Sequence, residues 1–240
     1  MNNTVFSSKD WLPGISVDCV LFCFHENQLK YLTLKFLNSD VWSLPGGVVG
    51  IKEGINDAAE RVLNERTGLS GIFLEQFYCF GEFGRNVNAR LEFEKIKSDI
   101  FRTTDDLDWI SSRFITLGYL AVVDYSKVNV SPGDISDQFL WQDVTDFKKL
   151  FLDHNEIVDK ALVKLRECLD TKLIAFSLLP ETFTMSEIQQ VYETILGTSI
   201  VRTNFQRKIL SLDILERIEK KYSGGAHKAP YLYRLKSNLG

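Results

Sequence analysis

Long apolar runs are missing from this chain of 240 residues. A membrane-spanning helix needs roughly 18 or more consecutive apolar residues, and no stretch of the sequence approaches that length. The opening residues, MNNTVFSSKDW, have neither the basic start nor the apolar segment of a secretory signal peptide. We therefore expect a cytoplasmic protein without a membrane partner.

The patterns that bind metals or form disulfides are also missing. None of the four cysteines belongs to a C-x-x-C pair, and none lies near a cluster of histidines. Their neighbours are apolar, and free cysteine behaves as a small apolar side chain. We expect neither a bound metal nor a cofactor, and we expect reduced, buried thiols at Cys19, Cys23, Cys79 and Cys168.

The overall composition is that of an ordinary soluble protein, with 45% hydrophobic and 25% charged residues. Its net charge of −4 is unevenly distributed. Residues 171–240 contain ten Lys and Arg against six Asp and Glu, whereas the rest of the chain contains 18 against 26. A basic C-terminal part favours a polyanionic partner, although many solvated surfaces are also basic.

The N-terminal half alternates between predicted strands and helices. Two β-rich runs at 15–24 and 29–36 flank the polar turn HENQ and predict a hairpin. The polar stretch 88–112 predicts an inserted helix or a loop. Further strands are expected within 71–84, at 113–125 and at 137–144. This alternation indicates an α+β or α/β domain.

An amphipathic helix is predicted at 155–169, where Ile157, Ala161, Leu162 and Leu165 recur at helical spacing. We interpret this helix as the connection between two domains. The predicted organisation is a first domain at 1–150, a connecting helix at 151–170 and a second domain at 171–240.

The second domain has the order of a winged helix-turn-helix. Thr184 and Glu187 have the spacing of a capping box and predict the start of a first helix. The turn GTSI leads to a second helix at 201–213, and a basic two-stranded ribbon follows, with the glycine-rich SGGA at its tip. In such domains the second helix enters the major groove of DNA.

The second helix carries polar side chains around Phe205 and Ile209, which are four residues apart and predict a buried anchor. Arg, Asn and Gln can read base edges, whereas Lys more often meets phosphate. The alternative is that these are ordinary charges on a small helical domain. The predicted DNA-binding residues are Arg202, Thr203, Asn204, Gln206, Arg207 and Lys208 on the helix, and Lys220, Lys221, His227 and Lys228 on the ribbon.

A glycine turn, a lone glutamate and an amphipathic helix follow one another in PGGVVGIKEGINDAAERVLNERTGLSG, at 45–71. The spacing is specific. It contains, in order, Gly47, Glu53, Arg61, Leu63, Glu65, Gly68 and Leu69. This pattern resembles the Nudix box, the loop-helix-loop of hydrolases that cleave nucleoside diphosphates linked to another group.

Two of the three helix carboxylates of the active hydrolases are absent. Positions 62, 65 and 66 lie on one face of a helix, and in the hydrolases this face presents carboxylate oxygens to Mg²⁺. Here it presents Val62, Glu65 and the cation Arg66, whose charge opposes metal binding. We expect a catalytically silent, degenerate box; the alternative is a displaced metal site that uses Glu92 or Glu94.

The rest of the box is predicted to hold the fold. Arg61 and Glu65 are four residues apart and form an expected ion pair, and Glu53 is expected to hydrogen-bond within the loop. The residues expected to pack under the sheet are Ala58, Ala59, Leu63 and Leu69.

The chain as a whole resembles the Nudix-related bacterial transcription regulators. The likeness rests on the box, on LLPETFT at 178–184 and on the helix that contains NFQRK at 204–208. It implies an α+β fold, with a Nudix-like α/β/α sandwich on a mixed sheet followed by a winged helix. It also implies a homodimer on a palindromic operator in double-stranded DNA. Some members respond to ADP-ribose and control NAD synthesis, and others respond to a sugar and control its use.

In this family the effector lies in the cleft that corresponds to the active site of the Nudix hydrolases. Asp18 is a carboxylate in an otherwise apolar strand and therefore needs a partner, which could be Arg85, Arg113 or a ligand hydroxyl. An internal salt bridge is the alternative. The candidate effector-binding residues are Asp18, Gly47, Glu53, Arg85 and Arg113.

These features predict a ligand-responsive DNA-binding transcription regulator, a repressor that is not an enzyme and that senses a sugar or an ADP-ribose-like metabolite. Two alternatives belong to other classes. One is a Mg²⁺-dependent Nudix pyrophosphatase with an accessory winged helix, and the other is a protein-binding adaptor.

Overall fold

The computed structural model describes residues 8–96, 103–146, 148–169, 173–221 and 229–236. The chain separates into two compact units. The first contains Met1–Phe22, Lys30–Ala121 and Val128–Lys164, and the second contains Cys23–Leu29, Val122–Lys127 and Leu165–Gly240. The division falls within one helix, α4 (His154–Cys168).

Seven strands form one sheet within the described residues. Their order is β3-β2-β1-β6-β5, with β4 also paired to β1 and β7 to β2. The strands are β1 (Trp11–His25), β2 (Gln28–Phe36), β3 (Trp42–Ser43), β4 (Gly46–Gly50), β5 (Glu75–Phe80), β6 (Ile115–Val122) and β7 (Ser136–Asp143). The predicted hairpin is confirmed: Glu26 and Asn27 turn between β1 and β2 with positive φ angles of 53° and 60°, as a two-residue hairpin turn requires.

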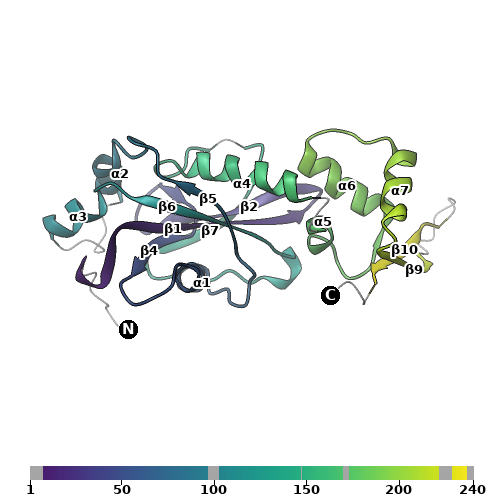
Figure 1. Cartoon of the computed structure of the whole chain (residues 1–240), viewed down its shortest axis with the longest axis horizontal. Coiled ribbons are helices and arrows are strands. Elements are labelled where there is room, and N and C mark those ends of the chain that lie inside the picture. Colours follow the sequence, from purple (N-terminus) through teal and green to yellow (C-terminus); the bar gives the residue numbers. More distant parts are fainter. Residues whose placement is uncertain (1–7, 97–102, 147, 170–172, 222–228, 237–240) are drawn as a thin grey trace. The chain divides into compact units, whose positions relative to one another are not determined.

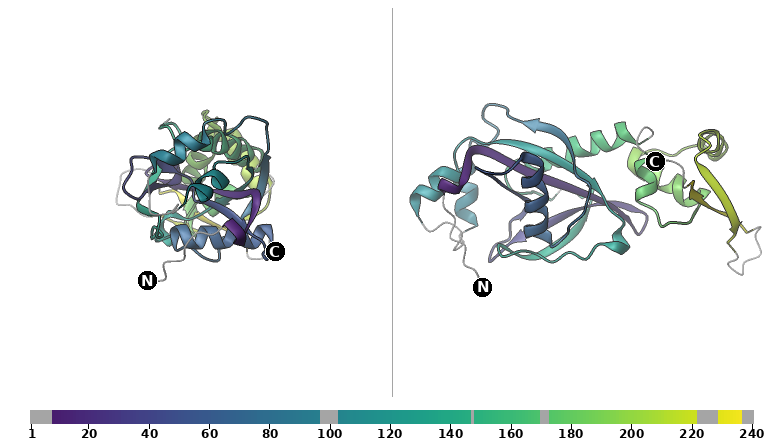
Figure 2. Two further views of the ribbon diagram at one scale, coloured as in Figure 1. Left: turned by 90° about the vertical axis from the view of Figure 1, so that its left-hand side faces the viewer. Right: turned by 60° about the horizontal axis from the view of Figure 1, so that its bottom comes forward.

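Helices cover both faces of this sheet. Helix α1 (Ile55–Thr67) lies on one side and α4 on the other (Figures 1 and 2). Because β1 lies between the two layers, every residue from 17 to 23 is buried, which explains its nearly continuous apolar sequence. The layered α+β fold predicted from the sequence is therefore confirmed.

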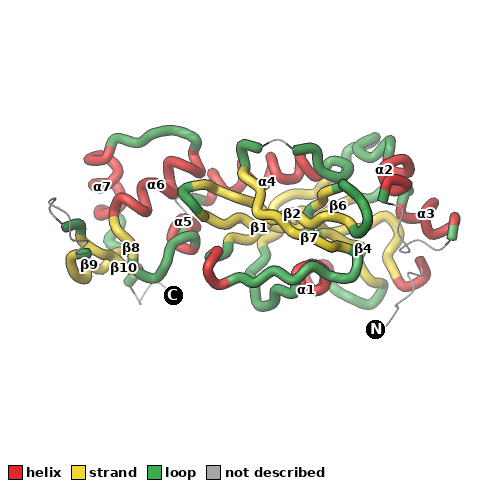
Figure 3. Tube along the Cα trace, turned by 180° about the vertical axis from the view of Figure 1, so that it is seen from behind, coloured by secondary structure: helices red, strands yellow, loops and turns green. Residues whose placement is uncertain are grey.

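In its described residues, the polar stretch between β5 and β6 contains two short helices rather than one. They are α2 (Ala89–Lys95) and α3 (Thr104–Ile110), which lie side by side (Figures 1 and 3). Single turns of 3-10 helix occur at Ser8–Asp10 and Tyr125–Lys127.

The second unit contains the predicted helix-turn-helix. Its elements are α5 (Ile174–Ser177), β8 (Phe183–Thr184), α6 (Met185–Leu196), α7 (Arg202–Ser211), β9 (Leu215–Lys220) and β10 (Tyr231–Leu235), grouped as Figure 3 shows. The prediction of a two-stranded ribbon was incomplete, because β8 pairs with β10 and the described sheet has the order β8-β10-β9. A two-residue strand is stable only on a partner, so its own sequence carries no signal.

The cysteine prediction was partly wrong. Cys19, Cys23 and Cys168 are buried thiols, but Cys79 is an exposed thiol on β5, which lies at the edge of the sheet. Within the described ranges, no helix combines the length and the apolar character that crossing a membrane requires.

Candidate functional site

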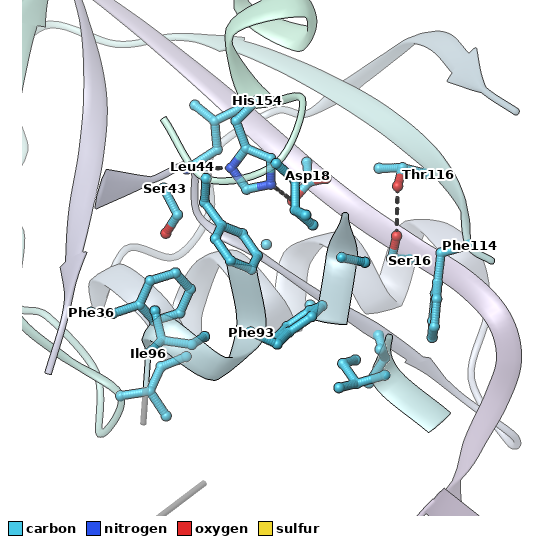
Figure 4. Close-up of a pocket in the computed structure, with 18 of the residues that line it drawn as sticks. Ser16, Asp18, Phe36, Ser43, Leu44, Phe93, Ile96, Phe114, Thr116 and His154 are labelled. Carbon is cyan, nitrogen blue, oxygen red and sulfur yellow. Dashed lines mark hydrogen bonds and ion pairs between the residues drawn. The ribbon is translucent and has the colours of Figure 1, made fainter. Parts of the chain in front are cut away.

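A cavity of about 230 Å³ lies in the first unit, beside the loop and helix of the box. Its walls include residues of β1, β2, β3, β4, α1, α2, β6 and the start of α4. The lining residues labelled in Figure 4 are Ser16, Asp18, Phe36, Ser43, Leu44, Phe93, Ile96, Phe114, Thr116 and His154. Apolar walls with a few polar groups are typical of small-molecule sites.

Asp18 faces His154 across the cavity wall. Their Oδ1 and Nε2 atoms are 3.7 Å apart, and each residue is only 6% exposed. The Leu44 amide donates to His154 Nδ1 over 2.9 Å, so the neutral imidazole carries its proton on Nε2, toward Asp18. Burial raises the pKa of Asp18 well above its ordinary value, against the effect of the Arg85 charge, and burial lowers the pKa of His154 to about 4.

Arg85 lines the cavity but already has an internal partner. Its Nε and Nη2 donate to the Asp153 carboxylate over 2.6 and 2.8 Å. Its Nη1 donates to the Phe80 carbonyl over 3.0 Å and to Thr116 Oγ1 over 2.7 Å, and Thr116 Oγ1 lies 2.7 Å from Ser16 Oγ. The guanidinium therefore braces the cavity wall.

Glu53 closes the loop between β4 and α1. It accepts from the Gly50 amide over 2.5 Å, and Arg61 donates to both of its carboxylate oxygens over 2.6 and 2.9 Å. Arg61 also donates to Glu65 over 2.9 Å. The expected Arg61–Glu65 pair and the loop role of Glu53 are thus confirmed. Mainly through the Arg61 hydrogen bond, the pKa of Glu53 is lowered; Glu53 itself lies outside the cavity lining.

Val62 does not lie on the open face where the sequence placed it. It is 1% exposed, and a Cβ added to Gly47 would lie 2.9 Å from one of its methyl carbons. Position 62 belongs to the apolar stripe of α1 because it follows Ala58 by one helical turn. The residues predicted to pack under the sheet are buried: Ala58, Ala59 and Leu63 on α1, and Leu69 just after it. The α1 residues that line the cavity are Arg61, Glu65 and Arg66.

Arg66 is half-buried in the cavity wall. Its Nε donates to the Gly46 carbonyl over 3.1 Å. Among the described residues, no carboxylate forms a salt bridge with it and no acceptor binds its two Nη groups. Burial lowers the pKa of this guanidinium, and the Glu65 charge acts in the opposite direction.

Two other predicted sites lie outside the cavity lining. Arg113 is exposed and donates to the Gly81 carbonyl over 2.9 Å. Glu92 pairs with Lys95 and Lys149, and Glu94 pairs with Arg90. Over the described ranges, no group of three or more His, Cys, Asp or Glu side chains is placed to hold a metal ion.

Helix α7 is anchored by the two apolar residues that the sequence singled out. Phe205 and Ile209 are 2% and 0% exposed, and the Phe205 ring meets Tyr192 of α6 edge-on, with centroids 5.1 Å apart. The turn before α7 is held by Glu193, which accepts from the Ile200 amide over 2.8 Å and from Gln189 over 3.0 Å. These contacts fix which face of α7 points outward.

The outward face of α7 carries the predicted DNA-binding side chains. Arg202, Thr203, Asn204, Arg207 and Lys208 are exposed, and Gln206 is half-buried. On the ribbon, Lys220 lies 5.7 Å from the Tyr231 ring, and Lys221 forms a 2.9 Å salt bridge with Glu187. The predicted residues His227 and Lys228 lie outside the described residues.

Comparison with known proteins matches residues 175–235 to the NrtR DNA-binding winged helix domain. An ADPR responsive transcriptional repressor, NtrR of Acinetobacter baylyi, is 27% identical over 229 residues, which cover 92% of this chain and 82% of the relative. The crystal structure of Shewanella oneidensis NrtR is 25% identical with a TM-score of 0.66, covering 93% of this chain and 94% of that one. The same protein complexed with a 27mer DNA is 24% identical with a TM-score of 0.65, covering 92% and 93%. With the observed fold and the box, these matches show that residues 175–235 resemble the NrtR-type winged helix and that the chain as a whole is similar to Nudix-related transcription regulators.

Proposed function

We propose that this chain is an effector-responsive transcription repressor that binds double-stranded DNA as a homodimer. Residues 171–240 bind the operator, residues 1–150 together with the start of α4 bind the effector in the cavity beside α1, and residues 151–170 connect the two domains. The effector is an ADP-ribose-like metabolite or a sugar. The description of the Acinetobacter relative as ADPR responsive favours the first of these.

The observation that carries the proposal is the outward face of α7. Phe205 and Ile209 bury one side of this helix, so its Arg, Asn and Lys side chains are held outward together rather than scattered. Arg and Asn can pair with base edges, and Lys can pair with phosphate. The match of this unit to a DNA-binding winged helix supports the same role.

Hydrolysis is not part of the proposal, because the box does not fit the Mg²⁺ of Nudix hydrolases. Position 62 is a buried valine, Glu65 is engaged by Arg61, and Arg66 brings a positive charge to the third position. Mg²⁺ requires near-octahedral oxygen coordination, which this set does not supply. We infer that the box supports a binding cavity and performs no chemistry.

Fluorescence anisotropy with labelled fragments from upstream of the gene tests DNA binding. We expect specific binding that weakens steeply as salt concentration rises, because lysine and arginine contacts displace counterions from DNA. Replacing Arg207 by alanine should weaken specific binding about tenfold, the usual cost of losing one base contact. Arg90→Ala, a change in an exposed arginine of the first unit, is the matched control and should leave the affinity unchanged.

If no fragment is bound specifically and Arg207→Ala leaves the affinity for DNA unchanged, the chain is not a DNA-binding regulator. Absence of any salt-dependent affinity for DNA would instead favour the adaptor.

The hydrolase alternative is tested by incubating the chain with ADP-ribose and Mg²⁺. We expect no turnover above background. Turnover that Glu65→Gln abolishes would establish the pyrophosphatase and overturn the silent-box inference.

A further inference from the structure

Arg66 differs from the other two arginines that line the cavity. Arg61 is paired with Glu53 and Glu65, and Arg85 is paired with Asp153. Within the described part of the chain, Arg66 has a carbonyl as its one hydrogen-bond partner. Withdrawing a guanidinium partly from water without a carboxylate costs free energy. This cost is recovered if a bound molecule supplies the missing acceptor.

Gly46 orients Arg66 and also adjoins Asp18. Its carbonyl accepts from Arg66 Nε, which leaves both Nη groups of the planar fork available to another acceptor. On β1, Asp18 is the pairing partner of Gly46, and a Cβ at position 46 would lie 1.9 Å from Asp18 Oδ1. One residue of β4 therefore separates a buried carboxyl group from a cation with unused donors, and both line the same cavity.

We propose that Arg66 binds a phosphate oxygen of the effector through its Nη groups, while the Asp18 carboxyl accepts a hydroxyl of the same molecule. This inference rests on the proposed function, because it specifies contacts of the same effector. A guanidinium matches phosphate in shape and charge and stays protonated at neutral pH. The effector is thus a phosphate-bearing sugar metabolite, and its binding requires no metal ion.

Isothermal titration of the full chain with ADP-ribose in excess EDTA tests this contact. We expect binding by the wild type without any divalent cation. Arg66→Gln should weaken it about 10- to 100-fold, the effect of removing one charge-assisted contact. Arg66→Lys keeps the positive charge but loses the planar guanidinium, so its affinity for ADP-ribose should lie between those of the wild type and Arg66→Gln. Arg90→Gln, which changes an exposed arginine outside the cavity lining, is the matched control and should bind as the wild type does.

Thermal unfolding without ligand separates a binding role from a structural one. Because Arg66 pairs with no carboxylate among the residues that the structure describes, Arg66→Gln leaves no such group unpaired and should not lower the melting temperature of the free chain. A large decrease would mean that Arg66 holds the fold, and would overturn the inference; the Arg66→Lys titration gives a second measure if Arg66→Gln does not fold.

Free D-ribose and L-arabinose form the second arm of the titration. If the wild type binds ADP-ribose and Arg66→Gln binds it equally well, the Arg66 contact is wrong, whereas the effector proposal stands. If the wild type binds a free pentose but not ADP-ribose, the phosphate contact is wrong and the effector is a neutral sugar. If it binds none of these, the effector half of the proposed function fails as well, independently of the Arg207 test.

Discussion

Backbone groups orient three of the polar side chains around the box and the cavity. The Leu44 amide selects the tautomer of His154, the Gly46 carbonyl holds Arg66, and the Gly50 amide holds Glu53. The side-chain partner of Asp18 is His154, which belongs to α4 and comes from a distant part of the sequence. A sequence pattern shows residue types but not which distant groups approach them, so the sequence left Arg85, Arg113, a ligand hydroxyl and an internal salt bridge open as partners of Asp18.

Replacement of Glu53 by glutamine should have a pH-dependent cost. The Arg61 hydrogen bond lowers the pKa of Glu53 below 4.5, so the folded state favours the ionised form. The resulting stabilisation is fully present above about pH 4.5 and is lost as the pH falls through the lowered pKa. Urea denaturation should therefore show Glu53→Gln less stable than the wild type at pH 7, with a smaller difference near pH 4.

Glu60→Gln is the control for this measurement. Glu60 lies on the same helix and is exposed, so the substitution should have little effect at either pH. An equal cost of Glu53→Gln at both pH values would mean that the ion pair with Arg61 does not stabilise the loop.

At the scale of elements, α1 illustrates how packing decides which residues of a sequence motif are buried and which reach the cavity. The helix ends at Gly68, whose φ of 72° suits glycine and whose amide donates to Asn64. Its buried stripe extends from Ala58 to Thr67 and includes Val62. The spacing of the box was readable from the sequence, but the angular width of the stripe was not, because it depends on how closely β4 approaches at Gly47.

The start of α6 provides a prediction for a single element. Thr184 and Glu187 form both hydrogen bonds of the capping box, with distances of 2.6 and 3.2 Å. Replacing Thr184 by alanine should cost about 1 kcal/mol of helix stability. Hydrogen exchange should become correspondingly faster in the first turns of α6.

Thr194→Ala is the matched control, since Thr194 is a threonine of the same helix whose hydroxyl donates to the Gln190 carbonyl, within the helix. Its substitution should leave exchange at the start of α6 unchanged. Equal effects of the two variants would show that the cap contributes nothing specific.

At the scale of the whole molecule, the function that we propose requires the two units to respond to one another. If ADP-ribose changes the affinity for operator DNA by a given factor, DNA must change the affinity for ADP-ribose by the same factor. We expect a factor of at least about five, the lower end of usual allosteric couplings. Anisotropy and calorimetry on the same chain measure the two factors independently.

A variant with Arg66→Gln is the control for this coupling. It should retain DNA binding but require more ADP-ribose to alter it. If saturating ADP-ribose leaves the DNA affinity of the wild type unchanged, the molecule does not act as an ADP-ribose-responsive repressor.

The sequence by itself determined the β1–β2 hairpin, the capped α6, the anchor of α7 and the register of the box, because turns, caps and helical periodicity are local properties. It also indicated which carboxylates the box lacks. Only the tertiary structure decided that Val62 is buried, that Arg85 is paired with Asp153 and that Asp18 faces His154. It alone brought Arg66 to the cavity wall without a carboxylate partner among the described residues. Burial and ion pairing depend on groups that are distant in the sequence, so they are settled only when the sheet and its helices pack together.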